Sequence, residues 1–343
     1  MSIPFLPELQ LPIIQAPMAG VQGSALAIAV SNAGGLGSLP CAMLGAEALQ
    51  QELDTIRRQT DRPINLNFFS HQMPVPDPAR ARAWQGLFRR YYRELDVEPA
   101  AAGPLRRPFD QATADIVCAW QPQVVSFHFG LPDTGLLEQV RSCGAKILSS
   151  ATTVEEALWL EAQGVDAIIA QGVEAGGHRG MFLSDDITTQ IGTMALLPQV
   201  LDVVRVPVIA AGGIADARGV KAALDMGAAA VQLGTAYLLC PEASTSALHR
   251  AALQSPLARH TVLTNIFSGR PARGMVNRMV RDLGPMNPLA PAFPLATAAS
   301  APLRAKAESQ GSHDFTPLWS GQNASACKAI PAAELTRELV SLL

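Results

Sequence analysis

Two glycine-rich turns are the first part of the chain whose residue types suggest chemistry. One reads Ala-Gly-Gly-Ile around Gly212 and Gly213, and the other reads Gln-Leu-Gly-Thr over residues 232–235. Each follows a short apolar run, so each predicts a tight turn after a strand. Glycine lets the backbone approach a ligand closely, and free amides at such turns suit a phosphate. The pair predicts a phosphate site; the alternative is two tight turns without a ligand.

A third glycine-rich run, Gln171-Gly-Val-Glu-Ala-Gly-Gly-His-Arg-Gly, contains His178. Its glycines predict a tight loop rather than a helix. An imidazole titrates near neutral pH, so His178 suits proton transfer. The spacing alone leaves a surface histidine in a glycine-rich turn equally open. We interpret Glu174 and Arg179 in the same run as solvated or structural residues.

Three more polar or soft side chains stand at the ends of predicted strands. Met18 could pack on a flat cofactor or simply fill the core. Asn67 can donate to and accept from the edge of a heterocycle. His128, in Ser-Phe-His-Phe-Gly, is interpreted as a positioned polar residue of the site more readily than as a base. We expect the remaining four histidines at the surface: His71, His249, His260 and His313.

Short apolar strands alternate with amphipathic helices, which is the pattern of repeated βα units. We predict strands at 12–18, 35–39, 63–69, 124–129, 145–150, 166–171, 206–211 and 228–233. We predict helices at 24–34, 46–59, 133–144, 153–164, 216–227 and 332–342. An open doubly wound sheet shares this periodicity, but eight strands with helical crossovers favour a closed (β/α)8 TIM barrel of the α/β class.

The barrel is predicted to occupy residues 1–265, with an insertion at 70–112 that includes a helix near the barrel mouth. Residues 266–316 are rich in Pro, Ala and Met and predict a smaller lid or accessory region after the eighth unit. Residues 317–343 are expected to form a C-terminal segment and a helix that packs on the barrel. Catalytic groups of such barrels gather at the carboxyl ends of the strands, where all the candidates above fall.

Composition excludes several classes of protein. Of the 343 residues 16% are charged and the net charge is −3, which argues against a nucleic-acid partner. Five cysteines form no CxxC pair, so we predict no metal site and reduced, mostly buried thiols. No apolar run approaches the roughly 20 residues that span a membrane. The start, MSIPFLPELQLP, lacks the pattern of a signal peptide, so we predict a cytoplasmic protein.

Taken together, the motifs resemble those of the nitronate monooxygenases, formerly called 2-nitropropane dioxygenases, and more closely the class I members of bacteria and fungi. The combination of NFF-x-H, SFHFG and EAGGHRG is specific, whereas AAGGI alone is shared by many flavin and phosphate barrels. The matching segments run from residue 12 to about 321. They are PIIQAPMAG, NLNFFSH, VVSFHFG, GVEAGGHRGMF, PVIAAGGIADARG, VQLGTAYLLCPEA, FSGRPARGMVN and LWSGQ.

The resemblance implies FMN as the cofactor, no metal, and His178 as the catalytic base. It implies oxidation by O2 of an alkyl nitronate of the propionate 3-nitronate type, giving a carbonyl product with nitrite and nitrate. A monomer or homodimer is expected. The residues implied to contact FMN are Met18, Asn67, Gln171, Gly176, Gly213, Gln232, Leu233, Gly234 and Thr235.

The chain departs from the family in one segment. Family members often carry Tyr after the barrel, where a phenol closes the substrate pocket, but this chain has Phe293 in that stretch and no Tyr beyond Tyr237. The departure puts the substrate preference in question. Tyr91 and Tyr92 in the insertion are the candidates to replace the missing phenol.

Two other functions remain open. An FMN-dependent NAD(P)H:quinone or enoyl reductase could use the same barrel. The chain has no GxGxxG dinucleotide fingerprint after a strand, which is weak evidence against that function. A non-catalytic flavin- or phosphate-binding barrel is the third hypothesis, and His178 counts against it.

Overall fold

The computed structural model describes residues 5–99 and 106–343. Residues 1–4 of the predicted barrel domain and residues 100–105 of the predicted insertion lie outside the described residues. Eight parallel strands form one sheet in the order β1-β9-β8-β6-β5-β4-β3-β2, and a parallel bridge from Ile14 to Leu36 joins its first and last strands. The sheet is therefore closed, and the predicted TIM barrel is confirmed.

The eight barrel strands lie close to the predicted segments. The first is much shorter than the predicted 12–18, because the chain leaves the sheet after Gln15. The strands are β1 (Ile13–Gln15), β2 (Gly37–Pro40), β3 (Ile64–Phe69), β4 (Val124–His128), β5 (Lys146–Ala151), β6 (Ala167–Gln171), β8 (Val208–Ala211) and β9 (Ala230–Leu233).

Successive strand residues point to two different cores, which is why the strands are apolar throughout. Ile14, Leu148 and Ile209 belong to the cluster inside the barrel, which also contains the N-terminal Phe5. Ile13 belongs to the larger cluster between the strands and the surrounding helices. Because both faces of each strand are packed, the strands cannot shift, and the side chains at their ends are held in place.

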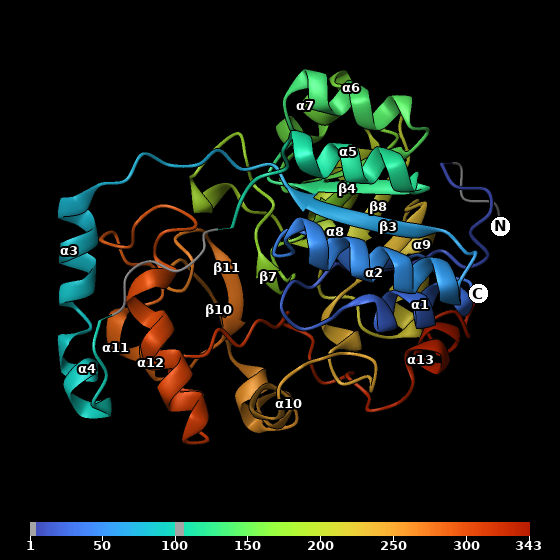
Figure 1. The fold of residues 1–343 in the computed structure, drawn as a ribbon. Helices are drawn as coiled ribbons and strands as arrows, with labels where there is room; N and C mark the ends of the chain where they lie inside the picture. The colour runs from blue at the N-terminus through green and yellow to red at the C-terminus, as the bar shows by residue number, and fades with distance from the viewer. Residues whose placement is uncertain (1–4, 100–105) are drawn as a thin grey trace.

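Helices cover the outside of the barrel (Figure 1). Two of them, α5 and α8, were not assigned from the sequence, and the last helix ends at Glu338 rather than 342. None of the helices in the described ranges has both the length and the apolar character needed to cross a membrane. The helices are α1 (Ser24–Asn32), α2 (Ala46–Gln59), α5 (Gln111–Trp120), α6 (Thr134–Ser142), α7 (Val154–Ala162), α8 (Thr193–Leu201), α9 (Ala217–Asp225) and α13 (Ala332–Glu338).

An accessory region lies beside the barrel and combines two distant parts of the chain (Figure 1). Trp84 and Phe88 of the insertion pack with Ile266, Ala296 and Leu303 in one buried cluster. The Trp84 indole N–H donates to the Ala296 carbonyl at 3.0 Å. The elements are α3 (Pro78–Gly86), α4 (Arg89–Leu95), α10 (Ala247–Leu253), β10 (Thr261–Thr264), β11 (Ala272–Met275), α11 (Arg278–Leu283) and α12 (Thr297–Ser309).

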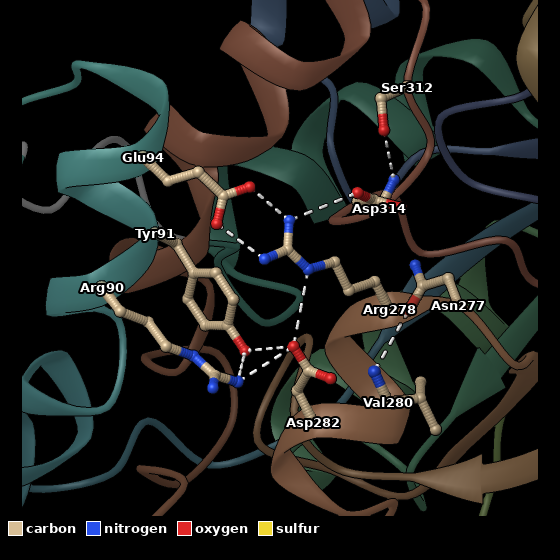
Figure 2. A network of polar contacts seen from close by, with 9 residues as sticks. All are labelled: Arg90, Tyr91, Glu94, Asn277, Arg278, Val280, Asp282, Ser312 and Asp314. Carbon is tan, nitrogen blue, oxygen red and sulfur yellow. Dashed lines mark hydrogen bonds and ion pairs between the residues drawn. The ribbon is translucent and has the colours of Figure 1, made fainter.

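A polar network joins α4 to α11 at the edge of this cluster, as Figure 2 shows. The Arg278 guanidinium donates to Glu94 Oε2 at 2.6 Å and lies 3.5 Å from Asp282 Oδ2. The same Asp282 oxygen accepts from the Tyr91 hydroxyl at 2.8 Å and from Arg90 at 2.9 Å. The two segments are thus held together by charge at the surface and by apolar packing inside.

A small sheet connects the accessory region to the loop after β6. The loop contains a two-residue strand, β7 (Gly177–His178), which pairs antiparallel with β11 so that His178 lies opposite Ala272. β10 extends this sheet on the far side of β11. The sequence predicted only a tight loop here, because two residues carry no period that could reveal a strand.

The prediction of five reduced thiols is wrong for two of them. Cys118 on α5 and Cys143 after α6 form a disulfide. Their helices pack side by side, and their Cα atoms are 5.3 Å apart. A separation of 25 residues in the sequence gives no sign of that proximity. Cys41 and Cys240 are free and buried, as predicted, and Cys327 is free and partly exposed.

Candidate active site

A pocket opens at the carboxyl ends of the barrel strands, where catalytic groups of such barrels lie. Leu233 is the one predicted site residue that does not line it, because its side chain packs in the core behind β9. Ten other predicted residues line the pocket: Met18, Asn67, His128, Gln171, Gly176, His178, Gly213, Gln232, Gly234 and Thr235.

His178 is held in place from three sides. Its backbone carbonyl accepts from Gln171 Nε2 at 3.0 Å and from His128 Nε2 at 3.2 Å. On the ring, Nε2 lies 2.8 Å from Ser268 Oγ. Pairing with β11 fixes the backbone itself. These contacts fix the orientation of the imidazole, which is half-buried. A fixed orientation is needed in a group that exchanges protons with a bound molecule.

Ser268 occupies one ring nitrogen of His178 and leaves the other free. Ser268 Oγ lies 2.8 Å from His178 Nε2 and 3.3 Å from the Arg270 carbonyl, and it accepts from the Arg270 amide at 3.4 Å. The hydroxyl can donate to the imidazole or to the carbonyl, so these contacts fit either tautomer of His178. Nδ1 makes no hydrogen bond to any residue that the structure describes. Nδ1 is therefore the ring nitrogen that is free to contact a ligand.

The surroundings of His178 disfavour its charged form. Burial lowers the pKa of His178 well below 6.5, and the nearby positive charge of Arg106 lowers it further. The imidazole is consequently neutral at neutral pH. A neutral imidazole can accept a proton, whereas an imidazolium cannot.

His128 lines the pocket, but both of its nitrogens are occupied. Nε2 donates to the His178 carbonyl, so Nδ1 accepts from the Ser150 hydroxyl at 3.1 Å. Burial lowers the pKa of His128 to about 4. This neutral ring supports the backbone of His178, in line with the sequence-based interpretation of a positioned polar residue.

Two charged residues stabilise the conformation of the loop after β6. Arg179 is fully buried and donates to the carbonyls of Gly172 and Gln171, both at 2.6 Å. Glu174 accepts from the Thr193 amide at 2.9 Å, at the first turn of α8. Neither side chain lines the pocket among the described residues. Their geometry is structural, as the sequence indicated.

The two glycine turns suit a phosphate. Gly212 and Gly213 have φ values of +116° and +71°, which side chains other than glycine adopt with difficulty. The amides of Gly213, Gly234 and Thr235 donate no hydrogen bond within the described chain. Free amides that converge at strand ends are the donors that a phosphate needs.

The pocket also suits a flat heterocycle. Gln232 Oε1 is buried without a partner among the described residues, so it needs a donor from a ligand. A Cβ on Gly176 would lie 2.5 Å from the Gly321 amide, so this wall has no room for a side chain. On another side, Met18 supplies a soft surface on which a ring can rest. The donors, acceptors and shape fit a flavin mononucleotide.

Aromatic rings from both the barrel and the accessory region surround His178. The ring centroids of Phe293 and Trp319 lie 5.4 and 5.6 Å from that of His178. Those of Phe129 and Phe69 follow at 5.9 and 6.3 Å. This apolar wall limits the water around the imidazole and explains why burial dominates its pKa shift.

Two histidine predictions were wrong. His71 and His249 were expected at the surface but are only 3% and 4% exposed. His71 packs edge-on against Phe293 at 4.7 Å, and His249 lines the pocket. Apolar neighbours from distant segments bury them, and their own short sequence motifs could not show this.

The tyrosines of the insertion do not take the place of the missing phenol. The Tyr91 hydroxyl binds Asp282, and the Tyr92 hydroxyl donates to the Ala299 carbonyl at 2.5 Å. Both rings lie in the accessory core, and neither lines the pocket. The suggestion that they compensate is therefore wrong.

Sequence reasoning missed three site residues. Ser268 lies inside the matching segment FSGRPARGMVN, but nothing in that segment indicates its contact with His178. Trp319, in LWSGQ, lines the pocket beside His178. Arg106 lines the pocket from the predicted insertion, where no motif marks it.

Comparison with known proteins identifies the family. The family model described as nitronate monooxygenase matches residues 5–341. A nitronate monooxygenase of Pseudomonas aeruginosa is 44% identical over 98% of this chain and 97% of its own length. One from Paraburkholderia phytofirmans is 42% identical over 96% and 91%.

Solved structures agree with the sequence comparisons. A nitroalkane oxidase from Streptomyces ansochromogenes superposes with a TM-score of 0.89 at 40% identity, over 97% of this chain and 95% of that one. FabK from Thermotoga maritima is more distant, with a TM-score of 0.71, 25% identity and coverage of 97% and 92%. The match to the family model across nearly the whole chain, with relatives above 40% identity, shows that the chain belongs to the nitronate monooxygenase family of oxidoreductases.

Proposed function

We propose that this enzyme uses FMN to oxidise alkyl nitronates with O2, giving a carbonyl product with nitrite and nitrate. One observation carries the proposal. The free Nδ1 of a neutral His178 belongs to the same pocket as two glycine turns whose amides are unpaired. The names of the relatives, nitronate monooxygenase and nitroalkane oxidase, support the same chemistry.

Different residues of the pocket would bind different parts of the cofactor. The amides of Gly213, Gly234 and Thr235 would bind the phosphate, while Gln232, Asn67 and Gln171 offer polar atoms to the ring edge and Met18 supports its face. Gly176 lets the backbone of residues 320–321 pack closely against the loop that forms this wall, and Leu233 would contribute through its backbone only. Bound FMN supplies the electron acceptor for the substrate and the centre that reacts with O2.

The proposed role of His178 depends on the substrate. A neutral nitroalkane must lose the proton on the carbon that bears the nitro group, and Nδ1 of the neutral imidazole accepts it. In the tautomer that performs this step, Nε2 carries the hydrogen and donates to Ser268 Oγ, so the lone pair is on Nδ1. A nitronate has already lost this proton. With a nitronate as the substrate, His178 therefore removes no proton and only lines the pocket.

The proposal is tested with pre-formed propionate 3-nitronate supplied to the purified yellow protein. We expect O2 consumption that saturates with substrate and is accompanied by nitrite. Free FMN at the same concentration is the control for oxidation outside the pocket. A rate no higher than that of free FMN would reject the function.

A further inference from the structure

Arg106 is a partly buried cation without a countercharge in the pocket. Among the described residues that line the pocket, it is the one Lys or Arg, and no Asp or Glu occurs. Its Nη1 atom is buried and has no hydrogen-bond partner within the described chain. A buried charged group without a partner is costly, and buried charges in proteins are normally paired. The missing partner is therefore expected to come from a ligand.

The surroundings of Arg106 hold its position but do not neutralise it. Its guanidinium lies over the Phe293 ring, 5.7 Å from the centroid. Its backbone carbonyl lies 3.2 Å from His71 Nε2. Burial lowers the pKa of Arg106, and the positive charge of Arg304 lowers it further. An arginine nevertheless stays protonated at neutral pH, so the pocket contains a fixed positive charge.

Arg106 belongs to the substrate side of the pocket. It follows β3 in the chain, and in the closed sheet three strands separate β3 from β8 in either direction. The glycine turns that suit the phosphate follow β8 and β9, across the barrel mouth. Phe293 contacts both Arg106 and His178, which places the guanidinium near the proposed base.

We propose that Arg106 binds an oxyanion of the substrate and so determines the preference of the enzyme for anionic substrates. The proposal rests on the proposed function, because it takes the nitronate as the ligand. The oxyanion is either the nitronate group or a carboxylate elsewhere on the same molecule. The planar guanidinium suits both, since each presents two oxygens in one plane.

This role fits the apolar character of the neighbouring wall. Phe293 lies against the guanidinium and cannot itself donate a hydrogen bond to a ligand. Arg106 supplies donors and a full charge from the segment before α5, and Phe293 contacts the guanidinium through a cation–π interaction. The same charge stabilises the anion that forms when His178 takes a proton from a neutral nitroalkane.

The first test compares Arg106→Gln with Arg107→Gln, which removes the same charge from an exposed neighbour. Removal of one partner from a desolvated charge pair typically costs about 2–5 kcal/mol, so kcat/KM should fall about 30-fold or more. Substrates are propionate 3-nitronate and propyl 1-nitronate. A loss for both assigns Arg106 to the nitronate group, and a loss for the first alone assigns it to the carboxylate. Equal rates in the two variants for both substrates would overturn the proposal.

The second test measures binding without turnover. Nitrate and propionate are titrated into the flavin-loaded protein, and their Kd values are read from the flavin absorbance. Arg106→Gln should weaken binding of at least one of these anions about 30-fold, and Arg106→Lys should restore part of it. Unchanged Kd values for both anions would overturn the proposal. This assay needs no nitronate oxidation, so it separates failure of the proposal from failure of the proposed function.

Two further readouts separate anion binding from a structural role. Arg106→Gln should keep its flavin, and its melting temperature should stay equal or rise, because the change removes an unpaired, partly buried charge. A clear fall in melting temperature would make Arg106 a structural residue. Flavin-free protein would make it a cofactor ligand instead. Either result would overturn the proposal.

Discussion

Nε2 of His178 lies 2.8 Å from Oγ of Ser268, although 90 residues separate them in the chain. His178 follows β6 of the barrel, whereas Ser268 lies between β10 and β11 of the accessory sheet. The accessory region therefore does more than cover the pocket. It supplies the hydrogen-bond partner of Nε2 and so leaves Nδ1 as the nitrogen of the proposed base that can face the substrate.

Ser268→Ala should reduce turnover of neutral nitroalkanes about 2–10-fold, because a neutral hydrogen bond contributes about 0.5–1.5 kcal/mol. The loss follows because the imidazole loses the hydroxyl that accepts from Nε2 in the proton-accepting tautomer. Nitronate turnover should stay nearly constant. Ser300→Ala is the control, since that buried hydroxyl bonds only within α12. A similar loss with both substrates would mean that Ser268 shapes the pocket rather than the tautomer.

His178→Asn should reduce turnover of neutral nitroalkanes by about 10²–10⁴-fold, the usual contribution of a general base. Turnover of pre-formed nitronates should change far less, because they carry no proton to remove. Steady-state rates with nitroethane and with its nitronate give the comparison, and the flavin spectrum checks that the cofactor is retained. Equal losses would indicate that His178 orients the substrate or stabilises its charge.

The pH profile for a neutral nitroalkane should report the lowered pKa of His178. The base form is complete at pH 6.5 and above and is lost as the pH falls well below that value. Thus kcat/KM, corrected for ionisation of the nitroalkane, should be flat from about pH 6.5 to 8 and should decline only in more acidic solution. His178→Asn should remove this decline. An inflection between pH 6.5 and 8 that depends on His178 would contradict the burial argument.

Gly213→Leu should yield largely flavin-free protein. Gly213 has a φ of +71°, and a Cβ there would lie 3.2 Å from the Glu174 side chain, beside the proposed phosphate site. Gly144→Leu is the matched control. It has a φ of +84° and open space for a Cβ, so it shares the backbone strain at a position remote from the pocket. The ratio of flavin to protein measures the difference, and equal ratios would refute the phosphate placement.

The barrel could be predicted from the sequence because its signal is local. Strands such as β6 are short apolar runs, and α2 was predicted with its exact bounds at Ala46 and Gln59 because its apolar residues repeat with the helical period. Most of the pocket residues follow from the assignment of the eight strands, since residues at the carboxyl ends of the strands must meet at one end of a barrel. Gln232 and Asn67 could therefore be named before the structure.

Contacts between distant segments could not be predicted. The Ser268–His178 bond, the two-residue strand β7 and the burial of His71 all depend on where the accessory region packs, and no periodicity encodes that. The Cys118–Cys143 disulfide has the same origin, because it follows from the packing of α5 against α6. Arg106 lies in an insertion that contains no recognisable motif. It is identified as a candidate ligand-binding residue only by its unpaired Nη1 atom in the pocket of the folded chain.

The most direct test of the proposed function is anaerobic reduction of the enzyme-bound flavin, followed by its absorbance after rapid mixing. Propionate 3-nitronate should reduce the flavin rapidly and with saturation, and NADH or NADPH should reduce it slowly or not at all. The absence of a dinucleotide fingerprint and the free Nδ1 of His178 motivate this expectation. Rapid, saturable reduction by NADH, with no reduction by the nitronate, would contradict the account and make the protein an NAD(P)H-dependent reductase.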